Sequence, residues 1–202
     1  MIDAVQEAGV LTLTLDRPEK ANAVTREMLA ELADRVEDVG SDACAVILTG
    51  RGRVFSAGAD LDAARAGLAT DAVWERLSGA VAGCPALTIA ALNGTAAGGA
   101  LGMVLACDLR IAVPGTSMFY PVMRLGFLPQ PSDPVRMAAL GGASAARRIL
   151  LAGEKISAGE AKALGLLDEI SEDCLAAAHA RAADACAAGQ VHVAAIKAMI
   201  PH

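Results

Sequence analysis

Short apolar segments separated by an amphipathic helix are the feature that most constrains the fold of this chain. Residues 45–49 (AVILT) form a continuous apolar run, which is typical of a strand buried on both faces. Residues 10–15 (VLTLTL) alternate apolar and hydroxylated side chains, which predicts a strand with one covered face. Between these runs, the apolar residues of segment 25–40 recur at helical spacing. The order strand, helix, strand favours parallel strands joined by crossover connections.

The same order returns in the middle of the chain. Residues 87–92 and 109–113 read as buried strands, and a helix between them should begin at a glycine bend, residues 98–99, and run to about Cys107. From residue 143 onward only helical patterns are evident. We therefore expect an α/β fold whose sheet lies in the first two thirds of the chain and whose C-terminal region is helical.

Composition narrows the class of protein. The chain has 202 residues, which fits one domain, and 54% of them are hydrophobic although only 2% are aromatic. Alanine and aliphatic side chains must therefore fill the core. The net charge of −6 and the lack of a basic run argue against nucleic-acid binding. No stretch has the roughly 20 unbroken apolar residues of a membrane span, and residues 1–9 do not look like a secretory signal. We expect a soluble, cytoplasmic protein.

Cysteine and histidine usage limits the chemistry available. The five cysteines are odd in number and widely scattered, which suits buried, reduced thiols: Cys44, Cys84, Cys107, Cys174 and Cys186. The only histidines are at positions 179, 192 and 202, with no spacing typical of zinc ligands. We therefore expect neither a metal site nor a cofactor. A serine hydrolase built on Ser56 also lacks a nearby histidine in the sequence.

Two glycine-bearing turns are the candidate site. Residues 55–61 (FSAGADL) and 93–100 (NGTAAGGA) each follow a buried-strand pattern. Glycine lets the backbone approach a ligand, and amides at a helix start are unpaired. If the strands are neighbours, one amide from each turn can converge on a single oxygen and form an oxyanion hole. The alternative, for either turn alone, is a tight strand-to-helix bend with no further role.

These turns belong to a longer set of segments in register. They run LDRPEKANA (15–23), VILTG (46–50), FSAGADL (55–61), ALNGTAAGG (91–99), ACDLRIA (106–112), RLGFLP (124–129) and GEKISAGEAKALGL (153–166). Over about residues 2–170 the chain resembles the crotonase superfamily, which includes the enoyl-CoA hydratase/isomerase family. The resemblance implies a crotonase-like (ClpP/crotonase) spiral of ββα units over residues 1–170, with residues 171–202 as a shortened helical segment of the same domain. It also implies a lyase- or isomerase-type protein of fatty acid metabolism that binds an acyl-CoA thioester as a homotrimer or hexamer.

The resemblance assigns roles to particular positions. It places the oxyanion amides at Ala59 and Gly99. The residues that it places around the acyl-CoA are Ala21, Ala23, Ala57, Asp60, Leu61, Gly98, Val122 and Gln130. Asp60 is equally suited to cap the following helix, and Arg17 can either meet a CoA phosphate or form a salt bridge in its loop.

The chain departs from the family where the acid–base chemistry should be. The two positions that carry glutamate in the hydratases of this family hold Gly102 and Val122, and neither can move a proton. Gln130 can orient a water molecule but is no base at neutral pH. Asp133 lies between two prolines and also fits a turn, and Tyr120 also fits ordinary packing with its hydroxyl at the surface.

Two hypotheses about function follow. In the first, the protein stabilises a thioester enolate without the usual glutamates, in a decarboxylation, a thioester hydrolysis or a slow isomerisation. Decarboxylation is the most economical of these, because the substrate supplies its own carbanion. In the second, the protein is a non-catalytic acyl-CoA carrier or partner subunit. The short C-terminal region implies an opened site, a partner's surface over it or a different oligomer, or else shortening without effect on the ligand.

Overall fold

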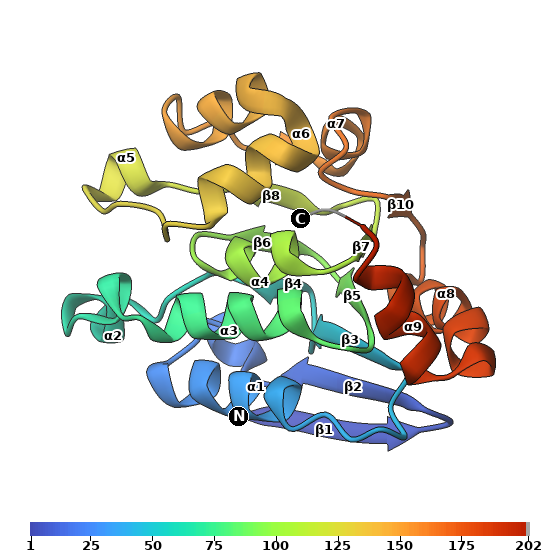
Figure 1. Cartoon of the computed structure of the whole chain (residues 1–202). Coiled ribbons are helices and arrows are strands. Elements are labelled where there is room, and N and C mark those ends of the chain that lie inside the picture. The colour runs from blue at the N-terminus through green and yellow to red at the C-terminus, as the bar shows by residue number, and fades with distance from the viewer. Residues whose placement is uncertain (201–202) are drawn as a thin grey trace.

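Two sheets form the centre of the computed structural model, which describes residues 1–200 (Figure 1). The six-stranded sheet has the order β1-β2-β3-β5-β7-β10 and the four-stranded sheet the order β4-β6-β8-β9. All neighbouring strands are parallel except β1 with β2 and β8 with β9. The strands are β1 Ile2–Glu7, β2 Val10–Leu15, β3 Ala45–Gly50, β4 Val54–Ser56, β5 Leu87–Leu92, β6 Thr95–Ala97, β7 Leu109–Ala112, β8 Ser117–Phe119, β9 Ile156–Ser157 and β10 Glu169–Ile170.

Pairs of strands followed by helices make up most of the chain. After the β1-β2 hairpin, each of three successive pairs gives its first strand to the large sheet and its second to the small one. This confirms the expected α/β spiral of ββα units. The helices are α1 Arg26–Glu37, α2 Leu61–Arg65, α3 Val73–Gly83, α4 Ala100–Ala106, α5 Val122–Leu125, α6 Asp133–Leu150, α7 Ala158–Ala163, α8 Cys174–Ala188 and α9 Gln190–Lys197, with 3-10 turns η1 Pro18–Lys20 and η2 Leu68–Thr70.

Helix α1 forms where the sequence pattern predicts it. The Thr25 side chain accepts a hydrogen bond from the Met28 amide at 3.4 Å, which caps the helix. Its buried face is apolar and packs against α3: Met28, Leu29, Leu32, Ala33 and Val36. Amphipathic spacing and a polar cap therefore fix both the start of this helix and the side it buries.

Helix α8 covers the other face of the large sheet. Its small buried residues Cys174, Ala178 and Ala182 pack against the second apolar cluster, formed by Val10, Ala45, Ile47, Ile89, Ala91 and Ile111. Small side chains let a helix approach a sheet closely, so the alanine-rich composition suits this layer. Four of the five cysteines are buried, as expected, and Cys186 is half-buried.

Several strands were not expected from the sequence. The prediction of only helices after residue 143 is wrong, because β9 and β10 lie there and β10 extends the large sheet beside β7. Strands β9 and β10 contain two residues each, too few to show a periodicity. Strand β1 lies at the edge of the sheet and is exposed towards its end, so it has no apolar alternation to detect. Within residues 1–200, no helix combines the length and apolar character needed to cross a bilayer.

Candidate functional site

Both glycine-bearing turns open onto one cavity. It has a volume of about 300 Å³ and lies beyond the ends of β4 and β6, beneath α2 and the segment around α5. Its walls are largely apolar, and Arg65 is the only charged residue among the lining residues: Ala57, Ala59, Leu61, Ala64, Arg65, Ala69, Trp74, Gly98, Gly99, Tyr120, Pro121, Val122, Leu125, Phe127, Leu128 and Gln130. A concave, mostly apolar site with a few polar groups is typical of small-molecule binding.

The two turns are in backbone contact. Strand β4 pairs with β6 in parallel, so the turns that follow them lie side by side. Gly58 has a φ of +92°, and a Cβ built on it would lie 2.8 Å from the Ala97 carbonyl oxygen. Gly98 has a φ of +58° and faces the Cα of Gly58. Only glycine combines this conformation with so close an approach. The buried strands that precede the two turns in sequence, β3 and β5, also pair in parallel, so the condition set for a shared site is met.

Ala59 and Gly99 are cavity-lining residues whose amides have no backbone partner among the described residues. In the first turn, the Asp60 amide donates to the Val24 carbonyl at 2.9 Å, and in the second, the Gly98 amide donates to the Phe119 carbonyl at 3.0 Å. The amide of Ala59, just before Asp60, and the amide of Gly99, just after Gly98, donate to no backbone carbonyl within the part of the chain that the structure describes. Both residues line the cavity.

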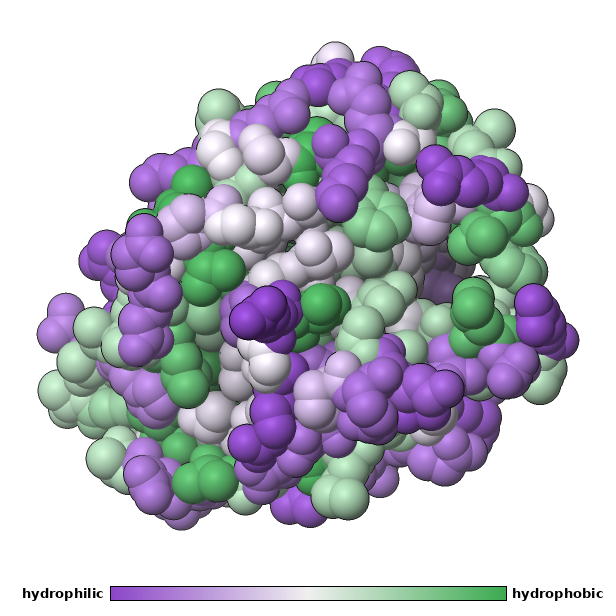
Figure 2. Space-filling model, turned by 180° about the vertical axis from the view of Figure 1, so that it is seen from behind, coloured by the Kyte–Doolittle hydropathy of each residue, from purple (hydrophilic) through white to green (hydrophobic). Residues whose placement is uncertain are grey.

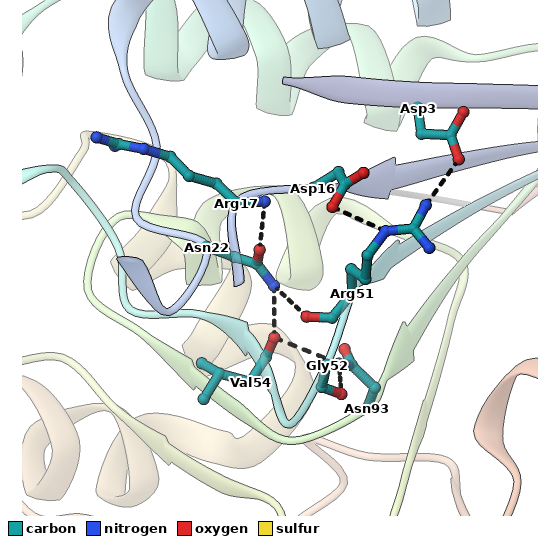
Figure 3. Close-up of polar contacts among 8 residues, drawn as sticks. All are labelled: Asp3, Asp16, Arg17, Asn22, Arg51, Gly52, Val54 and Asn93. Carbon is teal, nitrogen blue, oxygen red and sulfur yellow. Dashed lines mark hydrogen bonds and ion pairs between the residues drawn. The ribbon is translucent and has the colours of Figure 1, made fainter. Parts of the chain in front are cut away.

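Two asparagines hold the bend that leads into the first turn. Asn22 is fully buried and donates to the carbonyls of Arg51 at 3.0 Å and Val54 at 2.7 Å. Asn93, after β5, donates to the carbonyls of Gly52 at 2.9 Å and Val54 at 3.3 Å. Figure 3 shows both side chains reaching the same stretch of backbone from opposite sides. These bonds fix where β4, and thus the first turn, begins.

Ser56 supports the same turn from within. Its buried hydroxyl donates to the Asn22 carbonyl at 2.8 Å and accepts from the Gly58 amide at 3.1 Å. The histidines of the described chain, His179 and His192, lie on α8 and α9. With its hydroxyl engaged by backbone, Ser56 shapes the turn and is not activated as a nucleophile.

Trp74 forms the wall opposite the second turn. Its indole Nε1 donates to the Leu68 carbonyl at 2.8 Å, and a Cβ on Gly99 would lie 3.0 Å from its ring. This residue was not expected at the site from the sequence. The signal available was modest, a lone tryptophan on the buried stripe of α3. A side chain at position 99 would therefore crowd the Trp74 ring.

A carboxyl group lies buried behind the cavity wall. The Tyr120 hydroxyl donates to Asp133 Oδ2 at 3.0 Å, while Asp133 Oδ1 has no hydrogen-bond partner within residues 1–200. Burial, the largest cause, raises the pKa of Asp133 to about 7, and it also raises the pKa of the Tyr120 hydroxyl. The alternative of a surface hydroxyl for Tyr120 is wrong, and Asp133 is the buried first residue of α6.

Most of the residues expected at the site line the cavity. They are Ala57, Ala59, Leu61, Gly98, Gly99, Val122 and Gln130. Ala21, Ala23 and Asp60 are not among its lining residues. Ala21 accepts from the Ala57 amide at 3.0 Å, and Ala23 accepts from Arg17 Nη1 at 3.0 Å, so both support the wall from outside. Gln130 donates to the Ala69 carbonyl at 3.1 Å and ties the η2 turn to the cavity.

Asp60 has the capping role that the sequence left open. Its carboxylate accepts from the amides of Asp62 at 3.1 Å and Ala63 at 3.3 Å, at the start of α2. It also forms an ion pair with Arg17 at 2.9 Å. The hydrogen bond from Ala63, followed by that from Arg17, holds the pKa of Asp60 below its ordinary value. Of the two roles that the sequence left open for Arg17, the structure thus contains the salt bridge.

Apolar side chains surround the mouth of the cavity. Leu61 is 68% exposed and Leu128 is 82% exposed, and Leu125 and Phe127 lie nearby on the α5 side. Figure 1 shows α2 and α5 projecting at one edge of the molecule, and at the corresponding edge of Figure 2 hydrophobic residues flank a hollow. No group of three or more potential metal-ligating side chains occurs within residues 1–200.

The fold and this cavity define a crotonase-like α/β protein. A sequence profile described as enoyl-CoA hydratase/isomerase matches residues 5–202, and the chain belongs to this family. It is 36% identical to Bacillus subtilis YngF over 179 residues (84% of this chain, 68% of YngF) and 36% identical to Mycobacterium tuberculosis echA6 over 186 residues (91% and 75%). The chain thus spans about two thirds to three quarters of these relatives.

Solved structures support the same assignment. The crystal structure of an enoyl-CoA hydratase/isomerase from Pseudoalteromonas atlantica superposes with a TM-score of 0.90 at 30% identity, covering 98% of this chain and 81% of that one. The structure of Pseudomonas aeruginosa DspI also has a TM-score of 0.90 at 30% identity, covering 97% and 84%. The expected crotonase-like fold is confirmed.

Proposed function

We propose that this protein binds an acyl-CoA thioester in the cavity and polarises its carbonyl oxygen with the amides of Ala59 and Gly99. The observation that carries the proposal is that the amides of Ala59 and Gly99, on two adjacent turns, have no backbone partner among the described residues, and that both residues line the same cavity. Family membership supports the thioester as the ligand. The apolar walls suit an acyl chain.

Two fixed donors are suited to a charge that grows during reaction. When a thioester becomes an enolate, negative charge builds on its carbonyl oxygen, and main-chain amides that already point there need no reorganisation. Each such donor contributes on the order of 10²- to 10³-fold in rate. The site therefore favours reactions that pass through an enolate.

Decarboxylation is the reaction that makes least demand on these residues. The hydratase positions hold Gly102 and Val122, and no carboxylate is among the residues that line the cavity. In a 2-carboxyacyl-CoA, the bond between the α carbon and the carboxylate breaks, CO₂ leaves, and the electron pair becomes the enolate. No base is needed for this step, and the two amides stabilise its product.

The experiment combines binding with turnover. Purified protein is titrated by calorimetry with crotonyl-CoA and methylmalonyl-CoA, and each mixture is then analysed for hydration, loss of CO₂ and release of free CoA. Binding together with loss of CO₂ is the expected result. Binding without turnover favours the acyl-CoA carrier, for which the absence of a carboxylate from the lining residues is the supporting observation. Absence of binding overturns the proposal.

We also propose that the protein assembles as a homotrimer or hexamer, on the basis of its family membership. Sedimentation velocity tests this directly. The expected particle has three or six times the mass of the 20.4 kDa chain, and a monomer contradicts the proposal.

A further inference from the structure

The Tyr120–Asp133 pair is a buried ionisable pair that adjoins the cavity and has no part in the function proposed so far. Tyr120 lines the cavity, and its hydroxyl is 3.0 Å from Oδ2 of Asp133. Asp133 is fully buried, and its other oxygen, Oδ1, has no partner among the described residues. An unpartnered buried carboxylate oxygen is costly when charged, so this group is stabilised in its protonated form.

The charged groups around Asp133 do not neutralise it. Glu75 of α3 accepts from the Ser132 amide at 3.1 Å and the Ser132 hydroxyl at 2.9 Å, and it adds negative charge nearby. Arg136 of α6 donates to the Ser132 hydroxyl at 2.7 Å and is a favourable charge at longer range. Among residues 1–200, the phenol is therefore the one hydrogen-bond partner of the carboxyl group.

The backbone of α4 leaves the space that this carboxyl group occupies. A Cβ built on Gly102 would lie 2.7 Å from Asp133 Oδ1 and 3.3 Å from Oδ2. A side chain at position 102 and a carboxyl group in this place exclude each other. The carboxyl group of Asp133, at the start of α6, thus occupies the space beside α4 that a side chain of residue 102 would fill.

We propose that Tyr120 and Asp133 are the proton donor of the cavity, an inference that rests on the acyl-CoA function proposed above. When Asp133 is protonated, its carboxyl O–H donates to the phenol oxygen across the same 3.0 Å contact, the reverse of the hydrogen bond to the carboxylate, and the Tyr120 proton can turn to the cavity. When CO₂ leaves, the α carbon of the enolate takes the proton of the Tyr120 hydroxyl, and its electron pair forms the new C–H bond. The phenol oxygen takes the proton of Asp133 at the same time, so the tyrosine remains neutral. Water then returns one proton to Asp133. Tyr120 is the catalytic residue, and Asp133 acts through it.

The chemistry of each member suits this role. The phenol is a weak acid here, because burial and the neighbouring carboxyl group raise its pKa, so it gives up its proton only when another replaces it. Asp133 has a pKa of about 7, which lies near the operating range where a general acid is most effective. General acid catalysis contributes about 10²- to 10⁴-fold in rate.

The test separates proton transfer from packing. Tyr120→Phe keeps the ring and removes the hydroxyl, and Asp133→Asn keeps the shape and an oxygen acceptor but has no carboxyl proton. Asp168→Asn is the matched control: that carboxylate accepts from the Arg110 amide at 2.7 Å and lies outside the cavity. For all four proteins, calorimetric binding of methylmalonyl-CoA, kcat for loss of CO₂ and the pH profile of kcat are measured.

The expected result is a loss of kcat without a loss of binding. Tyr120→Phe and Asp133→Asn each lower kcat by about 100-fold, with affinity within about twofold of the unaltered protein, while Asp168→Asn changes neither. In the unaltered protein kcat falls tenfold per pH unit above about pH 7, and Asp133→Asn removes that fall. A variant of either residue that keeps full kcat and the same pH profile overturns the proposal, as does a protein that binds the thioester without releasing CO₂.

A spectroscopic measurement tests the protonation of Asp133 without depending on the proposed acyl-CoA function. Infrared difference spectra of the free protein between pH 6 and pH 8 should contain the C=O band of a protonated carboxyl group that is absent from Asp133→Asn. Without that band the proton donor is overturned even if the thioester binds and reacts. If the band is present but no thioester binds, the function proposed for the cavity is the part that fails.

Discussion

Gly102 and Asp133 pack against each other so closely that position 102 has no room for a side chain. The ideal Cβ of residue 102 would be 2.7 Å from the carboxylate oxygen, well inside van der Waals contact. Gly102→Ala should therefore lower the free energy of unfolding by about 1–3 kcal/mol, the usual cost of overpacking a core. Urea denaturation of the two proteins measures this difference in the free energy of unfolding.

A double-mutant cycle identifies the contact responsible. In the background Asp133→Ala the space above α4 is open, so adding Gly102→Ala should cost about 1 kcal/mol less than it does in the unaltered protein. Equal costs in the two backgrounds would mean that the carboxyl group of residue 133 does not occupy this space.

Gly58 is constrained both by its conformation and by a contact. Its φ is +92°, and a Cβ there would meet the Ala97 carbonyl oxygen at 2.8 Å, a backbone atom that cannot rotate away. Gly67 has a φ of +109°, but a Cβ placed on it would have no atom within 4 Å. Gly67→Ala should cost about 1 kcal/mol for the positive φ alone, and Gly58→Ala at least about 2 kcal/mol. Thermal denaturation of both variants measures the two losses, and similar melting curves would contradict the larger loss expected for Gly58→Ala.

The sequence was most informative where a single segment carries its own pattern. The run at residues 45–49 and the spacing in residues 25–40 predict β3 and α1, because burial on two faces and on one face leave different periodicities. The short strands β9 and β10 are not predicted from the sequence, because they form by pairing with strands more than 35 residues away in sequence, Ser117–Phe119 and Leu109–Ala112. No local pattern records such a contact.

The residues of the candidate site also differ in how far a local sequence pattern predicts them. Glycines at positions 58 and 98 indicate the two turns, because the backbone there adopts a positive φ that favours glycine. The burial of Tyr120 against Asp133 depends on how α6 packs over α4, and in sequence each residue fits a simpler role. Asn22 is another case: adjacent alanines drew attention to its segment, while two of its three side-chain hydrogen bonds are formed with Arg51 and Val54, which folding brings there from elsewhere in the sequence.

Asn22 should be among the costliest polar side chains to remove. It is fully buried, accepts from the Arg17 amide at 2.9 Å and donates to two carbonyls of the β3–β4 bend. Asn22→Ala should lower the free energy of unfolding by about 2–3 kcal/mol, because it leaves buried backbone groups unpaired. Asn93→Ala, at a half-buried position, should cost about 1 kcal/mol. Chemical denaturation of both variants compares them, and a larger loss for Asn93 would contradict the assigned order.

Asp133 should make the stability of the protein depend on pH. Its pKa is about 7 in the folded state against an ordinary value of 3.8, so between these values the folded state binds more protons than the unfolded state. The stabilisation is full below about pH 4 and is lost as the pH rises towards 7, by at most about 4 kcal/mol. In Asp133→Asn this dependence should disappear. Urea midpoints at pH 5, 6, 7 and 8 measure it, and parallel curves for the two proteins would show that Asp133 is already charged at pH 5.

Gly99 offers the sharpest test of the main-chain donors. Its φ of −58° is one that proline adopts, so Gly99→Pro removes the N–H with little change of backbone angle. Gly99→Ala is the matched control, because it places a Cβ at the same distance, 3.0 Å, from the Trp74 ring but keeps the N–H. The proline variant should lose about 10²- to 10³-fold in kcat for loss of CO₂, and the alanine variant no more than about tenfold. Both should keep thioester binding, because the donor matters most to the charge of the enolate, which the ground state lacks. If the two variants lose activity equally, the crowding of Trp74 is responsible, and the Gly99 amide is not the donor.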